Sequence, residues 1–193
     1  MTATTAVRWW PLVGLAGLVA LGLAVGKGTT PLDAWFTRTG DEHPQLGRLL
    51  FFTDGRVMFV AGVVVLAATL FRRRWRLATV VAVTPLVAVA AARLFKQLFG
   101  RLSDGVLAYP SGHTTLAVVV LGLAVLATGV AVWSVVTAAA LAVLGLLGQA
   151  FTYHYFTDTI GAVFLGTSLV CVAAWAAGLD RCQPHCDLSH NSG

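Results

Sequence analysis

The sequence predicts an all-α fold: a polytopic membrane protein built as a bundle of six transmembrane helices. Hydrophobic residues make up 58% of the 193-residue chain and charged residues only 11%, against roughly 25% charged residues in a soluble domain. The mean hydropathy is +0.82. All eight acidic residues fall between apolar runs or at their ends, as expected because a carboxylate at the centre of a spanning helix costs roughly 2.5–3.5 kcal/mol.

Six apolar runs are the predicted spans: Trp9–Gly26, Leu50–Phe71, Leu77–Phe95, Thr114–Gly129, Trp133–Phe151 and Thr159–Leu179. At 1.5 Å per residue, runs of roughly 19 to 22 residues cross a hydrocarbon core of roughly 30 Å. The fourth run is the shortest, and we expect its helix to extend back through Gly112 and His113. The first run lacks a clear small-x-small cleavage site, so we expect it to remain as an anchor. In the last run, Ala162 and Gly166 form a pair suited to close helix packing.

The connections between these runs are unequal in length. Residues 27–49 form a long polar connection and residues 96–111 another, whereas 72–76 and 130–132 are short turns. Short turns favour antiparallel neighbours, so residues 1–180 are predicted to form one bundle. Residues 181–193 are expected to be a disordered polar tail. Its cysteines and histidines match no standard zinc spacing, so no metal is expected there.

Four arginines in one short turn predict the orientation: Arg72, Arg73, Arg74 and Arg76. The positive-inside rule places this turn, and with it both chain ends, in the cytoplasm of a plasma-membrane protein. The loops on the two sides of the membrane hold equal numbers of basic residues, so the predicted orientation depends on the concentration of arginines in this one turn. The net charge of +5 then reflects topology and anionic headgroups rather than nucleic acid, because no basic face is interleaved with aromatic residues. The loops at 27–49, 96–111 and 152–158 face outward.

The segment Pro110-Ser111-Gly112-His113 stands at the start of the fourth predicted span. Serine is a good N-cap, and the first free N–H groups of a helix favour an anion. Gly112 allows a phosphate to approach the backbone, and His113 can donate a proton to a phosphate ester. Taken alone, the segment is also explained by a capped helix start with an incidental histidine.

A second histidine, His154, precedes the sixth predicted span, with Asp158 four residues later. A carboxylate at this spacing can reach the Nδ1–H of the histidine across one turn. The contact fixes the tautomer and leaves Nε2 as a nucleophile or base. The alternative is that Asp158 or Thr157 merely caps the helix, and both roles can coexist.

Two cations end the third predicted span, Lys96 and Arg101. Arginine can hold phosphate oxygens with two parallel hydrogen bonds, and lysine supplies a point charge. The alternative is that both side chains extend toward lipid headgroups.

Together these segments resemble the type 2 phosphatidic acid phosphatase superfamily. Its signature reads, in order, Lys-x6-Arg-Pro, Pro-Ser-Gly-His and Ser-Arg-x5-His-x3-Asp. The second part is complete at Pro110–His113, the third keeps His154 and Asp158, and the first keeps Lys96. The motifs occupy residues 93–166, and the six-span layout extends the resemblance over most of the chain.

The resemblance implies a role for each matching residue. His154 is the expected nucleophile, held by Asp158, and His113 the expected general acid. Lys96, Ser111 and the Gly112 amide are expected to hold the phosphate oxygens. The family needs no metal ion, so neither metal nor cofactor is expected.

Two family arginines are missing. The first falls on Ser103, followed by Asp104 in place of proline, and the second falls on Gly148, beside Gln149. Arg101 is one candidate replacement. The other candidates are Arg93, Arg38, Arg48 and His43.

The sequence therefore predicts an integral membrane phosphatase that hydrolyses a lipid or polyprenyl-linked phosphate through a phosphohistidine. Its Ala-, Val- and Arg-rich usage suggests bacterial cell-envelope or phospholipid metabolism. The expected partners are the lipid phosphate and membrane lipids, with no nucleic acid and no signal for an oligomeric state. Two alternatives stay open: an inactive relative that binds lipid phosphates, and a lipid phosphotransferase. A transporter is disfavoured because no ionisable residue lies near the middle of a span.

Overall fold

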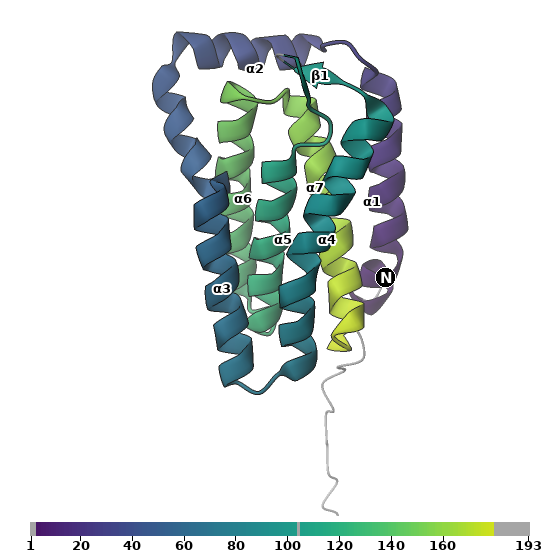
Figure 1. Cartoon of the computed structure of the whole chain (residues 1–193), viewed down its shortest axis with the longest axis vertical. Helices are drawn as coiled ribbons and strands as arrows, with labels where there is room; N and C mark the ends of the chain where they lie inside the picture. The colour runs from purple at the N-terminus through teal and green to yellow at the C-terminus, as the bar shows by residue number, and fades with distance from the viewer. Residues whose placement is uncertain (1–2, 104, 180–193) are drawn as a thin grey trace, which may run out of the picture.

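The computed structural model describes residues 3–103 and 105–179 and confirms the all-α class (Figure 1). The elements are, in chain order, α1 (Ala3–Val25), α2 (Pro31–Glu42), the 3-10 helix η1 (Pro44–Thr53), α3 (Gly55–Phe71), α4 (Trp75–Phe99), β1 (Leu102–Ser103), β2 (Val106–Leu107), α5 (Gly112–Ala127), α6 (Val132–Thr152) and α7 (Phe156–Ala176). The two short strands pair antiparallel. The predicted tail at 181–193 lies outside the described residues.

Five segments of the described chain, rather than six, are long and apolar enough to cross a membrane. They are Val7–Val25, Pro44–Phe71, Trp75–Phe99, Val132–Thr152 and Phe156–Ala176. The fourth predicted span is α5, which is apolar but has only 16 residues. At 1.5 Å per residue it is about 24 Å long, shorter than a hydrocarbon core of roughly 30 Å.

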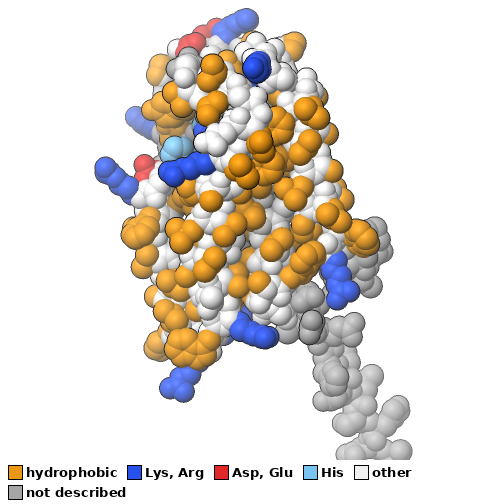
Figure 2. All heavy atoms as spheres, turned by 45° about the vertical axis from the view of Figure 1, so that its right-hand side comes forward, with side chains coloured by type: hydrophobic (Ala, Val, Ile, Leu, Met, Phe, Trp, Pro, Cys, Tyr) orange, Lys and Arg blue, Asp and Glu red, His pale blue; other side chains and the backbone are white. Residues whose placement is uncertain are grey.

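Helix α5 is the centre of the bundle, in contact with α3, α4, α6 and α7. Its side chains join a core with residues of α4 and α7, including Val119, Leu123 and Leu77. The predicted close packing in α7 is present, because a Cβ on Gly166 would lie 2.7 Å from the Val118 side chain of α5. The outer helices expose large apolar side chains, and Figure 2 shows these spread along the sides of the molecule. Such a surface suits lipid rather than water.

The connection at residues 27–49 is not the polar loop that the sequence suggested. It contains α2 and most of η1, and α2 lies across one end of the bundle (Figure 1). Thr30 starts α2 with a capping box: its side chain accepts from the Asp33 N–H, and the Asp33 carboxylate accepts from the Thr30 N–H. Pro31 occupies the first helical position, which favours a helix start. The second predicted span likewise divides at Asp54, the N-cap of α3.

The two ends of the bundle differ in what they carry. The described start of α1, the end of α7 and the arginine-rich turn between α3 and α4 lie at one end (Figure 1). Helix α2, the β1–β2 hairpin, the start of α5 and the α6–α7 connection lie at the other. All three motif segments therefore meet at the same end, as an antiparallel bundle requires.

Candidate active site

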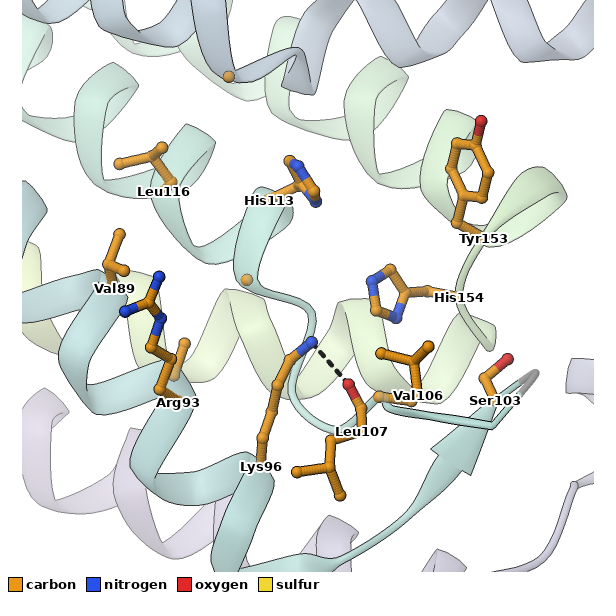
Figure 3. Close-up of a pocket in the computed structure, with 14 residues that line it drawn as sticks. Val89, Arg93, Lys96, Ser103, Val106, Leu107, His113, Leu116, Tyr153 and His154 are labelled. Atoms are coloured by element: carbon orange, nitrogen blue, oxygen red, sulfur yellow. Dashed lines mark hydrogen bonds between the residues drawn. The ribbon is translucent and has the colours of Figure 1, made fainter.

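A cavity of about 540 Å³ opens at the motif-bearing end, between α4, α5, the hairpin and the α6–α7 connection. Four lining side chains carry or can accept positive charge: Arg93, Lys96, His113 and His154 (Figure 3). Among the described lining residues none is acidic. The cavity is thus suited to an anion.

His113 is presented by the first turn of α5. Ser111 is the N-cap, and its hydroxyl accepts from the Thr114 N–H at 3.4 Å. The Ser111 N–H donates to the Asp158 carbonyl at 3.1 Å, which ties this start to the first turn of α7. Gly112 and the exposed His113 line the cavity, whereas Ser111 is fully buried and does not. Two residues of this helix start, Gly112 and His113, thus line the cavity.

His154 lies in the connection between α6 and α7, and its backbone N–H donates to the Gln149 carbonyl. The His154 Nδ1 is 3.7 Å from the Asp158 Oδ2. This is longer than a hydrogen bond, and Nδ1 is buried without a hydrogen-bond partner. The same Oδ2 accepts from the Tyr155 N–H at 3.3 Å. Asp158 therefore caps α7 and also faces the imidazole.

Lys96 and Arg93 project into the cavity from the end of α4 (Figure 3). The Lys96 Nζ donates to the Leu107 carbonyl at 2.8 Å, which leaves two of its three protons for another acceptor. Arg93 lies one turn earlier on the same helix and is exposed. Together they place two cations on one wall of the cavity.

Arg101 is not brought to the cavity. Its side chain is fully buried, and it forms ion pairs with Asp33 at 2.9 Å and Asp158 at 2.6 Å. It also donates to the Gly28 carbonyl and the Thr157 hydroxyl. The Arg101 side chain thus lies among Asp33, Asp158 and Gly28 and does not line the cavity.

Asp33 is an acidic partner of Arg101 that the sequence did not reveal. Its side chain is fully buried. Burial raises the pKa of Asp33, but hydrogen bonds from the N–H groups of Thr157 and Thr30 and from Arg101 outweigh it and lower the pKa below the ordinary value of 3.8. The capping-box spacing of Thr30 and Asp33 was a signal for helix α2, but no local pattern pointed to Arg101.

The two positions of the missing family arginines differ in their surroundings. Ser103 lines the cavity. Gly148 faces η1 instead, where an added Cβ would lie 2.6–2.8 Å from backbone atoms of Leu49 and Leu50. Next to it, the buried Gln149 donates to the Thr53 hydroxyl of η1 at 2.8 Å. Three candidate replacements are exposed and do not line the cavity: Arg38, Arg48 and His43. Asp104 lies outside the described residues.

An apolar groove of about 320 Å³ runs between α3, α4 and α5. It is lined by residues such as Phe59, Val63 and Leu86, with no charged side chain among those described. The groove and the cavity share Gly55, Val89 and Leu116. The cavity that holds the two histidines and the two cations thus adjoins an apolar groove.

The described residues contain no group of three or more His, Cys, Asp or Glu side chains that could hold a metal ion. Comparison of the chain with family models, curated proteins and solved structures found no match.

Proposed function

We propose that this protein is an integral membrane phosphatase that hydrolyses a lipid phosphate through a phosphohistidine. One observation carries the proposal: His113 and His154, from two motifs forty-one positions apart in the chain, line one cavity together with Lys96 and Arg93. A helix start, two basic side chains and two imidazoles form a site for phosphoryl transfer, whose catalysis rests on positioning and charge stabilisation.

The reaction proceeds in two balanced steps. The His154 Nε2 attacks phosphorus, the bond from phosphorus to the leaving oxygen breaks, and His113 gives that oxygen a proton. Water then attacks the phosphohistidine, His113 takes a proton from the water, and the phosphorus–Nε2 bond breaks to release inorganic phosphate. One histidine acts first as acid and then as base, as general acid–base catalysis of a two-step transfer requires.

Lys96, Arg93 and the Gly112 N–H are the groups that hold the phosphate oxygens. Each of these residues lines the cavity. Arg93 replaces one of the missing family arginines, because its side chain is exposed at the cavity whereas that of Arg101 is buried in ion pairs. Arginine can bind two phosphate oxygens at once, which also fixes their orientation.

The adjoining groove supports a lipid as the substrate. Its lining is apolar and it shares Gly55, Val89 and Leu116 with the phosphate cavity. A hydrocarbon chain in the groove leaves its phosphate beside the two histidines. Glycerol-linked and polyprenyl-linked phosphates both meet this requirement.

We propose that six segments span the membrane, namely the five long ones and the shorter helix α5. Because α5 is surrounded by α3, α4, α6 and α7, its ends need not reach the lipid surface, and 16 residues suffice. By the positive-inside rule, the end of the bundle that carries the arginine-rich turn between α3 and α4 faces the cytoplasm. The cavity then lies at the outer face of the plasma membrane.

Phosphate release by detergent-purified protein tests the proposal. A panel of phosphatidic acid, phosphatidylglycerophosphate and polyprenyl mono- and diphosphates is assayed with a chelator present. We expect release by wild type, loss of release in His154→Ala, and a slower reaction with a short water-soluble phosphate ester. Folded protein that binds these lipids without releasing phosphate indicates a binding protein, and a phosphorylated acceptor alcohol in place of free phosphate indicates a phosphotransferase.

A further inference from the structure

A buried cluster of one guanidinium and two carboxylates lies behind the proposed nucleophile. Arg101 donates through Nη1 to Asp158 Oδ1 at 2.6 Å and through Nη2 to Asp33 Oδ2 at 2.9 Å. All three side chains are fully buried. They come from three distant segments: α2, the loop after α4 and the first turn of α7.

The Arg101 guanidinium has no donor left for a substrate. Its five N–H groups are matched by five hydrogen bonds: two to the Gly28 carbonyl, one to the Thr157 hydroxyl and one to each carboxylate. Its carbon also lies 4.5 Å from the ring centroid of Tyr155, the neighbour of His154. Arg101 therefore contacts both the carboxylate and the loop that present the imidazole.

Asp33 joins helix α2 to the same point. Its carboxylate accepts from the Thr157 N–H at 2.9 Å and from the Thr157 hydroxyl at 3.0 Å, in addition to Arg101. Helix α2 is thus fixed to the first turn of α7, one residue before Asp158. Asp33 and Asp158 thus share one buried guanidinium, which links α2 to the carboxylate beside His154.

We propose that Arg101 and Asp33 are positioning residues that hold Asp158 against His154. Arg101 occupies Asp158 Oδ1, and the Tyr155 N–H approaches Oδ2 at 3.3 Å. The carboxylate cannot then turn away, and Oδ2 keeps its place 3.7 Å from the His154 Nδ1. The carboxylate charge at this distance already favours an Nδ1–H directed toward it, which leaves Nε2 for phosphorus. Closure of the gap when substrate binds turns this contact into a hydrogen bond.

This inference rests on the proposed function for its kinetic test. The variants are Arg101→Lys, which keeps the charge but not the planar fork, and Asp33→Asn. Asp33→Asn leaves one guanidinium paired with one carboxylate, so a folded protein is expected. Asp41→Asn is the matched control, because Asp41 is an exposed carboxylate on the same helix. Arg93→Gln shows how kcat and KM change when a proposed phosphate contact is lost.

In both positioning variants kcat falls about 10- to 100-fold, the loss that a displacement near 1 Å produces, while KM changes less than about twofold. Asp41→Asn behaves as wild type, and Arg93→Gln raises KM. A raised KM with unchanged kcat in Arg101→Lys overturns the proposal, because it identifies Arg101 as a phosphate ligand.

A second readout does not depend on turnover. The imidazole of His154 is observed by nitrogen NMR in ¹⁵N-histidine-labelled protein, with its signals assigned by their loss in His154→Ala. We expect one tautomer in wild type, protonated at Nδ1, and a mixture of tautomers in folded Asp33→Asn. The same single tautomer in Asp33→Asn overturns the proposal, whether or not wild type releases phosphate. If Arg101→Lys does not fold, Asp33→Asn alone decides.

Discussion

The close contact of α6 with η1 at Gly148 predicts that even a methyl group is not accepted there. In Gly148→Ala the new Cβ would lie 2.6 Å from the Leu49 carbonyl carbon, 2.7 Å from the Leu50 nitrogen and 2.8 Å from the Leu49 oxygen. All three are backbone atoms, which no side-chain rotation can move. The shortest distance falls about 0.8 Å below ordinary van der Waals contact, and overpacking of this kind costs about 1–3 kcal/mol.

Thermal unfolding of the detergent-solubilised protein measures this cost. Gly62→Ala in α3 is the matched control for stability, because a Cβ there meets nothing within 4 Å. Both variants make the same change in helix propensity, so their difference isolates the packing cost. We expect Gly148→Ala to unfold at a clearly lower temperature than Gly62→Ala, and Gly148→Arg to be less stable still. Equal stability of the two alanine variants refutes the claim that η1 excludes a side chain from position 148.

Three further predictions follow from the site. Asp158→Asn keeps the shape of the side chain but removes its charge, so we expect kcat to fall about 10²- to 10⁴-fold with KM nearly unchanged. Initial rates over a range of substrate concentrations measure both constants. An equal change in kcat and KM contradicts the orienting role. Ser103→Arg places a guanidinium in the cavity wall and is expected to lower the inhibition constant of inorganic phosphate about 3- to 10-fold, a fraction of a charge-assisted hydrogen bond; an unchanged constant shows that position 103 does not reach the phosphate. The pKa of Asp33 lies below 3.8 in the folded protein, so its stabilising contribution is complete above that value and is lost as the pH falls through the folded-state pKa. The stability difference between wild type and Asp33→Asn, followed by thermal unfolding, therefore stays constant near neutral pH and shrinks below about pH 4. A stability difference that grows as the pH falls contradicts a lowered pKa of Asp33.

The regions that sequence predicted best are those in which local pattern decides structure. Apolar runs bounded by charges gave the long helices of the bundle, because lipid excludes ionised groups whatever the tertiary packing. Ser111 was identified as an N-cap from its place before an apolar run, and it is one. Such signals lie within a few residues of the feature they specify.

The sequence was less informative where distant segments meet. Helix α2 was expected to be a loop, because its mixed polar and apolar residues resemble a connection when read against membrane spans. Arg101 was expected at the phosphate, yet its side chain is bound by Asp33, 68 positions away. Gly148 lacked an explanation until η1 was found against it. No periodicity or spacing encodes which of two arginines faces a cavity.

The most direct test of the central claim is to find the phosphoryl group on the enzyme. The detergent-purified protein is mixed with a lipid phosphate that it hydrolyses, quenched in base, which preserves phosphohistidine, and digested for mass spectrometry. We expect phosphate on the Nε2 of His154 in wild type, and no phosphohistidine in His154→Ala. Phosphate release without a phosphorylated His154, or release that persists in His154→Ala, would contradict the account.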